Sequence, residues 1–201
     1  MFSIIQAAGW PAWPLIFASI VAVALIVERF ISLKRQKILP KNLLDEVLNL
    51  HRNRQVTSEV IQKLEANSPL GRVFACALRH ELSAREIQKE SIEQTGHAVA
   101  HDMGKYLSSL GTIAAVAPLM GLFGTVVGMI EIFGAQAPSG TNPQVLAQGI
   151  SIALYNTALG IVIAVPAMIF YRYFRARVED YLVNMEQQAI RLVDIIRGNR
   201  K

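Results

Sequence analysis

The chain has 201 residues, of which 52% are hydrophobic, and its formal net charge is +5. Such an apolar composition is unusual for a soluble domain. All 20 Lys and Arg residues lie in two blocks, 29–105 and 172–201. Because basic residues are kept on the cytoplasmic side of a membrane, this partition predicts an integral protein of the bacterial inner membrane with its N-terminus outside. The basic residues flank apolar stretches and form no stripe with aromatic residues, which argues against nucleic-acid binding.

The first apolar stretch, residues 11–33, follows a short N-terminal segment, 1–10, that we expect on the periplasmic side. The stretch is long enough to cross a bilayer as a helix, which takes about 20 residues. Trp10 and Trp13 stand at its outer end, where amphipathic rings favour the interface. No basic residue precedes the stretch, whereas several follow within 29–37. We therefore interpret it as a retained anchor and not as a cleaved signal peptide.

Residues 34–105 are predicted to form a cytoplasmic helical region. Apolar residues within 42–50 and within 56–64 recur with helical spacing. Further on, Ser83-Ala84-Arg85-Glu86 matches a capping box, in which a serine side chain caps the start of a helix. No proline follows in the rest of this region. We therefore expect one unbroken helix from Ser83 to position 133, continuing from the cytoplasm into the second span.

The second and third apolar stretches, 106–133 and 145–171, are also long enough to cross a bilayer. The segment between them, 134–144, contains Pro138 and Pro143 and no charged residue. These features are typical of a short outer loop that joins an antiparallel helix pair. The predicted fold is an all-α integral membrane protein with three transmembrane helices. The second and third of these helices extend far into the cytoplasm.

The C-terminal segment, 172–201, is expected to continue the third helix as a cytoplasmic helix. It carries an apolar seam with heptad spacing, which is typical of a helix that packs against another helix. Two interpretations stay open: the seam packs on helices of its own cytoplasmic region, or on neighbouring copies of the chain. The members of the seam are Val178, Leu182, Met185, Ala189, Leu192 and Ile196.

Small residues form one face on each of the last two spans. In the second span, Gly121, Gly124 and Gly128 recur at steps of three or four residues. In the third span, Ala153 and Gly160 lie seven residues apart, which is about two helical turns. Such faces let helix backbones approach closely in lipid. Packing alone explains the pattern. The more specific interpretation is that these residues seat a transmembrane helix of a partner protein.

Polar side chains within the same spans predict a route for an ion. A Ser or Thr hydroxyl can bond a carbonyl one turn back in its own helix, whereas an amide in lipid is costly and needs a partner. Pro118 and Pro166 each free one backbone carbonyl and are predicted to kink their helices. The predicted ion-pathway residues are Thr125, Ser151, Asn156 and Thr157.

The sequence lacks a carboxylate in the middle of a span. A proton path needs a group that titrates near the membrane midplane, and hydroxyls titrate far too high for this role. Glu28 and Glu131 lie close to the ends of their spans. If the protein conducts protons, the carboxylate should therefore come from another chain. No phosphate-binding loop motif is present, so ATP is not the expected energy source.

Nothing in the sequence predicts an enzyme, a cofactor or a metal centre. His97 and His101 have the spacing of metal ligands on a helix, but no further ligand accompanies them, so a solvated helix face is the favoured interpretation. Cys76 is the only cysteine, which excludes an intrachain disulfide. We expect it to behave as a small buried apolar residue.

Two long motifs lie in the second and third spans. They are APLMGLFGTVVGMI at 117–130, and GISIALYNTALG at 149–160 followed by AVPA at 164–167. They are similar to the ExbB/TolQ/MotA family of ion-channel subunits, and most similar to its ExbB-like branch. The resemblance implies that five copies surround a central pore holding an ExbD-like partner, whose single span supplies the missing aspartate. It also implies a role in powering a TonB-like protein that drives outer-membrane import.

The resemblance further implies that Thr125 and Thr157 are the two pore threonines of the family. One position departs from the family pattern. Familiar ExbB and TolQ proteins have a glutamate five residues before the second threonine, where this chain has Ile152. A mechanism that depends on that glutamate does not carry over. Two other functions stay open: a TolQ-like envelope-constriction motor, and a non-conducting membrane scaffold.

Overall fold

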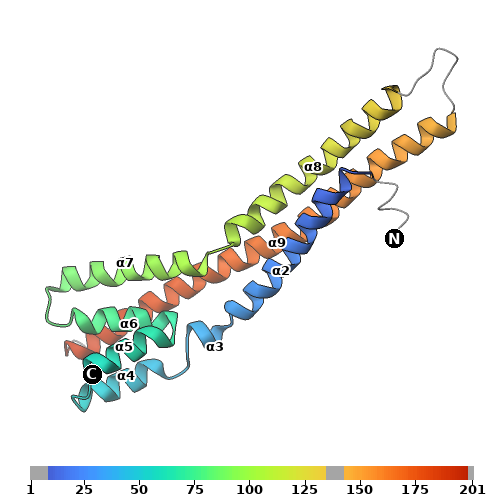
Figure 1. Cartoon of the computed structure of the whole chain (residues 1–201). Helices are drawn as coiled ribbons and strands as arrows, with labels where there is room; N and C mark the ends of the chain where they lie inside the picture. The colour runs from blue at the N-terminus through green and yellow to red at the C-terminus, as the bar shows by residue number, and fades with distance from the viewer. Residues whose placement is uncertain (1–8, 135–142, 199–201) are drawn as a thin grey trace. The chain divides into compact units, whose positions relative to one another are not determined.

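The structure is a computed structural model that describes residues 9–134 and 143–198 (Figure 1). Within these two ranges the chain is helical and contains no strand, so the prediction of an all-α fold is confirmed. The helices are α2 (Ala12–Ser32), α3 (Arg35–Ile38), α4 (Leu43–Arg52), α5 (Ser58–Asn67), α6 (Pro69–Arg79), α7 (Arg85–Met103), α8 (Leu107–Gly134) and α9 (Pro143–Ile196).

The chain divides into two compact units. The first, which we call the apolar unit, comprises residues 1–28 and 106–173; the second, the basic unit, comprises 29–105 and 174–201. This division nearly matches the partition of charge along the sequence, because Arg172 is the only basic residue in the apolar unit. The two compact units therefore nearly coincide with the segments that the charge pattern predicted to lie in the membrane and in the cytoplasm.

Three helices are long and apolar enough to cross a membrane: Ala12–Ser32, Leu107–Gly134 and Leu146–Ile196. They overlap the three predicted spans. Their large apolar side chains are widely exposed, with Phe17 69% and Val162 67% accessible. Water penalises exposed apolar surface of this extent, whereas lipid does not. The exposure therefore fits a membrane protein.

A small cluster of side chains holds α2, α8 and α9 together in the apolar unit. Leu15, Ala117 and Ala164 are buried in it, and partly buried apolar residues surround them. Two of the three buried residues are alanines, so the helices meet through small side chains at this point. Close approach through small residues is the usual way in which helices pack in lipid.

The predicted unbroken helix from Ser83 to position 133 is wrong. Helix α7 ends at Met103, and α8 begins at Leu107. The amide of Gly104 still donates to the carbonyl of Ala100, at 2.9 Å, but Tyr106 has a φ of +64°, in the left-handed region. A right-handed helix does not pass through a left-handed residue. The break therefore comes from backbone conformation and not from a proline.

The capping box predicted at Ser83 is also wrong. The N-cap residue of α7 is Ala84, and no side chain caps this helix end. The carbonyl of Ser83 instead accepts a hydrogen bond of 2.6 Å from Nη2 of Arg197, close to the end of α9. The four-residue pattern matched the motif, but in the structure the helix begins one residue later, without a side-chain cap.

The predicted amphipathic helices of the cytoplasmic region are present as α4 and α5. Leu43, Val47 and Leu48 are buried on α4, and Leu64 is buried on α5. Thr57 caps α5 by accepting from the amide of Val60 at 3.4 Å. In both helices the apolar spacing predicted the buried face correctly.

The helix α6 was not predicted. Ser68 is its N-cap and accepts from the amide of Gly71 at 3.1 Å, and Pro69 occupies the first turn. These are favourable residues for a helix start. A Cβ at Gly71 would lie only 2.1 Å from the carbonyl oxygen of Leu64, so the close approach of α5 and α6 requires glycine at this position.

The heptad seam of the C-terminal segment packs inside the basic unit. Met185, Ala189 and Leu192 are fully buried. Leu182 faces α7, where its Cδ1 would lie 3.2 Å from a Cβ at Gly96. The structure thus supports the interpretation that the seam packs on helices of its own chain.

Candidate functional site

The predicted site residues lie where α8 and α9 meet in the apolar unit. A Cβ added at Gly121 would lie 2.8 Å from the carbonyl oxygen of Asn156 and 3.3 Å from Cα of Gly160. In return, a Cβ at Gly160 would lie 2.6 Å from the carbonyl oxygen of Ala117. The backbones of the two helices are therefore in direct contact, and glycine on both sides makes this contact possible.

The remaining small residues continue this contact along the helices. Gly124 faces the side chain of Asn156, since an added Cβ would lie 2.6 Å from that residue's Cβ. Gly128 faces Ala153 at ordinary van der Waals distance, 3.5 Å between Cβ positions. These residues were predicted to seat the helix of a partner. That role stays a prediction; within the chain itself, α9 packs on the glycine face of α8.

Asn156 is the polar residue most deeply placed in this helix pair. Its side chain is fully buried, and Nδ2 donates to the carbonyl oxygen of Ile152 one turn earlier, at 3.3 Å. Burial of an amide away from water is favourable only when the amide is hydrogen-bonded. The bond to Ile152 lies within α9, whereas the contact with α8 is made by the side chain of Asn156 against Gly124.

The two predicted pore threonines make different hydrogen bonds. Oγ1 of Thr157 donates across the helix pair to the carbonyl oxygen of Gly121, at the long distance of 3.5 Å. Oγ1 of Thr125 donates within its own helix to the carbonyl oxygen of Leu122, at 2.6 Å. A bond at 3.5 Å is weak. The hydroxyl of Thr157 thus has the weaker of the two hydrogen bonds.

Ser151 lies away from the helix contact. It is exposed, and Oγ donates to the carbonyl oxygen of Ala147 one turn back, at 2.9 Å. This internal bond lets a hydroxyl face lipid without losing its partner. Of the predicted pathway residues, Asn156 and Thr157 therefore share the α8–α9 contact, and Ser151 lies outside it.

The two prolines lie inside their helices, as the sequence placed them. Pro118 is in α8 and Pro166 is in α9. Each proline has a chain neighbour that is almost completely buried: Ala117 before Pro118, and Ala167 after Pro166. A proline in a helix interior removes one backbone hydrogen bond and frees a carbonyl one turn earlier. The freed carbonyls belong to the same helix pair as Thr157.

Outside the helix pair, the basic unit carries several ion pairs. Nη1 of Arg72 lies 2.8 Å from Oδ2 of Asp102. This hydrogen bond is the main reason why the pKa of Asp102 is held below its ordinary value, and the charges of Arg72, Lys105 and His101 act in the same direction. Asp102 therefore keeps its charge to a lower pH than an ordinary aspartate. Both partners are well exposed, so this pair adds little to stability.

The structure also shows the surroundings of the two histidines with metal-ligand spacing and of the single cysteine. His97 and His101 are exposed on α7, and in the parts of the chain that the structure describes no three His, Cys, Asp or Glu residues group as metal ligands. Cys76 is partly exposed and not buried as predicted. Its Sγ donates to the carbonyl oxygen of Ser91 at 3.4 Å.

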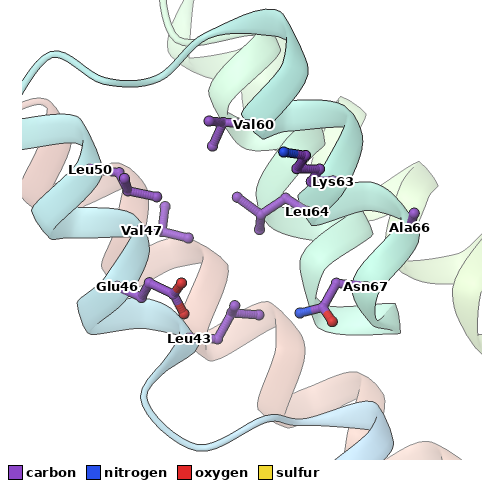
Figure 2. Close-up of a pocket in the computed structure, with 9 residues that line it drawn as sticks. All are labelled: Leu43, Glu46, Val47, Leu50, Val60, Lys63, Leu64, Ala66 and Asn67. Carbon is purple, nitrogen blue, oxygen red and sulfur yellow. The ribbon is translucent and has the colours of Figure 1, made fainter.

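A pocket of ≈ 500 Å³ lies between α4 and α5 in the basic unit, and the sequence did not predict it. Figure 2 shows Val47, Leu50 and Leu64 facing one another across it, with Glu46 and Lys63 among the lining residues. None of the predicted ion-pathway residues lines this pocket. It is therefore separate from the candidate site on α8 and α9.

Comparisons with known proteins cover the candidate site. Residues 65–187 match the MotA/TolQ/ExbB proton channel family. The chain is 32% identical to the biopolymer transport protein exbB1 of Vibrio cholerae over 168 residues, 81% of this chain and 74% of that protein. It is also 32% identical to the biopolymer transport protein ExbB of Salmonella typhimurium over 191 residues, 89% of this chain and 77% of that protein. The chain therefore belongs to the MotA/TolQ/ExbB proton channel family, in its ExbB-like branch.

Proposed function

We propose that this protein is the channel-forming subunit of a complex that energises biopolymer transport across the cell envelope. In this proposal it converts the ion gradient of the inner membrane into mechanical work on a TonB-like protein. The observation that carries the proposal is the family match over residues 65–187, which includes all of α8 and most of α9. The names of the relatives from Vibrio and Salmonella, both biopolymer transport proteins, support the same role.

In the proposed mechanism the hydroxyl of Thr157 takes part directly in the passage of the ion. Its hydrogen bond to Gly121 is long, at 3.5 Å, so exchanging that acceptor for water or a hydrated ion costs little. Thr125 is proposed as the second hydroxyl, although its shorter bond to Leu122 must first open. Asn156 positions the pair by holding α9 against Gly124.

The titrating group is proposed to come from a second protein. In α8 and α9 up to the basic C-terminal region, Glu131 is the only acidic residue, and it lies near the end of α8. An ExbD-like single-span protein with an aspartate in the membrane would supply the missing acid. Because α9 occupies the glycine face of α8, that partner would contact other sides of the two helices. We propose a ring of copies of this chain, five by family resemblance, around the partner.

The test is ion flux through purified complexes in liposomes. The chain is co-reconstituted with its single-span partner, and flux is measured for wild type, Thr157→Val and Thr157→Ser. Valine has nearly the same volume but no hydroxyl, so we expect normal assembly and loss of flux, whereas serine keeps activity. Thr112→Val is the matched control, because Thr112 bonds Ser108 in its own helix and is exposed. Undiminished flux in Thr157→Val would refute the role of Thr157.

The same assay separates the proposal from the scaffold alternative. A scaffold would pass no ion with any partner, even when the wild-type complex assembles fully. A TolQ-like motor would conduct, so flux does not separate it from an ExbB-like one. Complementation does: an ExbB-like protein restores TonB-dependent uptake in a deficient strain, and a TolQ-like protein restores envelope constriction.

A further inference from the structure

Three basic side chains lie on the single-turn helix α3 and its N-cap residue, immediately after α2. Lys34, Arg35 and Lys37 are all exposed, and we call them the basic turn. Between Glu28 and Asp45 the sequence has no acidic residue. The chain thus places a local excess of positive charge directly after a helix that is suited to cross a membrane.

Some basic residues of this unit are held in ion pairs, unlike the members of the basic turn. Arg72, Arg79 and Arg85 each pair with an acidic side chain. In the described parts of the chain, 9–134 and 143–198, no such ion pair involves any member of the basic turn. Arg29, at the end of α2, is different again, since it is buried and donates to the carbonyl oxygen of Met103 at 2.8 Å. The charges of the turn therefore remain available to an external anion.

The backbone of the turn is fixed on both sides. On the N-terminal side, the hydroxyl of Tyr181 donates to the carbonyl oxygen of Leu33 at 2.9 Å, in a buried position. On the C-terminal side, Ile38 and Leu39 are buried, only 2% and 6% exposed. A site whose backbone is already ordered loses little conformational entropy when it binds. The three side chains thus project from an anchored support.

Chain connectivity keeps the basic turn near the membrane surface. Lys34 is two residues beyond Ser32, the last residue of α2, and Lys37 is five beyond it. An extended chain spans at most about 3.6 Å per residue, so these positions lie within roughly 7 and 18 Å of the end of the helix. Electrostatic attraction extends over about 8 Å at physiological ionic strength. In the proposed insertion of α2, Lys34 therefore lies within this range of lipid phosphates at the end of the helix, and the long side chain of Arg35 can extend toward them.

We propose that the basic turn binds the headgroup of an anionic phospholipid of the phosphatidylglycerol type. The guanidinium of Arg35 can bond a phosphate through two N–H groups, and the two ammonium groups add compact charge. A zwitterionic lipid carries its own cation beside the phosphate, so it neutralises the turn less well. The inference rests on the proposed membrane insertion of α2, but it does not depend on ion conduction.

The test measures lipid binding by the purified full-length protein in detergent, where membrane orientation plays no role. The probes are phosphatidylglycerol and phosphatidylcholine with a fluorescent acyl chain. Each basic group near an anionic surface contributes a factor of about five to affinity, so three should give a preference for phosphatidylglycerol of at least about tenfold. The variant Lys34→Gln/Arg35→Gln/Lys37→Gln should lose most of this preference.

A matched control removes the same charge elsewhere in the basic unit. Arg52, Arg54 and Lys63 are exposed at the end of α4, in the following loop and on α5. The variant Arg52→Gln/Arg54→Gln/Lys63→Gln should keep the wild-type preference. Equal preference in both variants, or no preference in the wild type, would overturn the proposal.

Two further measurements keep the outcome clear. If the triple variant does not fold, raising the salt concentration around the wild-type protein should abolish its preference for phosphatidylglycerol, and a preference that resists salt would contradict an electrostatic site. The variant Thr157→Val should keep full lipid preference. Loss of flux without loss of lipid binding then separates this inference from the proposed channel function.

Discussion

The contact between Gly121 and α9 leaves no room for a methyl group. The atoms that a Cβ would meet belong to the backbone of Asn156, Thr157 and Gly160, so they cannot rotate away. Overpacking of this kind typically costs about 1–3 kcal/mol, because the helices themselves must separate. Gly128 offers the opposite case, since its nearest neighbour lies at ordinary contact distance.

We expect Gly121→Ala to destabilise the protein by about 1–3 kcal/mol and Gly128→Ala to keep its stability or raise it by up to about 1 kcal/mol. Thermal unfolding of the purified protein in one detergent, followed by circular dichroism, measures both variants. Alanine favours a helix over glycine by about 1 kcal/mol, so Gly128→Ala also controls for propensity. A normal melting temperature for Gly121→Ala would contradict the direct backbone contact.

Arg197 joins parts of the basic unit that are far apart in sequence. Its Nε donates to Oε1 of Gln88 at 2.9 Å, and its Nη2 donates to the carbonyl oxygens of Ser83 and Glu81. Gln88 is only 1% exposed, so losing Arg197 would leave a buried amide oxygen without this donor. Hydrogen bonds to charged groups contribute about 1.5–3 kcal/mol, and buried groups deprived of them are costly.

We therefore expect Arg197→Met to lower the free energy of unfolding by about 2 kcal/mol. Arg191→Met is the control, since Arg191 is exposed on the last turns of α9, shortly before Arg197. Hydrogen exchange at the amides of the first turn of α7 should increase in Arg197→Met alone. If both variants exchange alike, the contacts of Arg197 do not hold that turn.

At the level of helices, the break between α7 and α8 depends on the left-handed backbone of Tyr106. Left-handed conformation costs an ordinary residue roughly 1–2 kcal/mol, less for Asn, and most for a β-branched residue. Comparing Tyr106→Asn with Tyr106→Val isolates this cost, because both variants lose the ring. We expect the valine variant to unfold at a lower temperature, by about 1 kcal/mol in stability. Equal melting temperatures would mean that the junction does not require the left-handed residue.

The sequence predicted helices better than it predicted their ends and their neighbours. Apolar spacing located α4, α5 and the three apolar helices, because burial of one face is a local pattern. It did not predict the end of α7, although Gly104, the C-cap residue, is of a type that often ends helices; the left-handed residue is Tyr106, whose type does not favour that conformation. The capping box at Ser83 was wrong by one position, because α7 has Ala84 as its N-cap residue and no side-chain cap.

A similar limit applies to the candidate site. The spacing of glycines predicted that one face of the second span meets another helix, and this is correct. Spacing does not say which helix: within the chain it is α9, and contact with a partner helix stays a prediction. The roles of Thr125 and Thr157 came from family resemblance, and sequence alone could not show that one hydroxyl bonds its own helix and the other crosses to its neighbour.

For the whole molecule, the partition of basic residues leads to a test of orientation. In a Cys76→Ala background, which has no other cysteine, single cysteines are introduced as Gly134→Cys and Gln62→Cys. Gly134 ends α8 with no atom within 4 Å of an added Cβ, and Gln62 is exposed on α5. A membrane-impermeant maleimide applied to intact spheroplasts should label Gly134→Cys only, because basic segments stay inside. Labelling of Gln62→Cys from outside would reverse the proposed topology.

The reciprocal contact of Gly121 and Gly160 also constrains how the chain can diversify. A side chain on either residue would strike the backbone of the opposite helix, so neither position can gain a methyl group while the two helices keep their present distance. A lineage that enlarges one of them must first widen the gap between the helices. The two sites should therefore change together in descendants, or not at all.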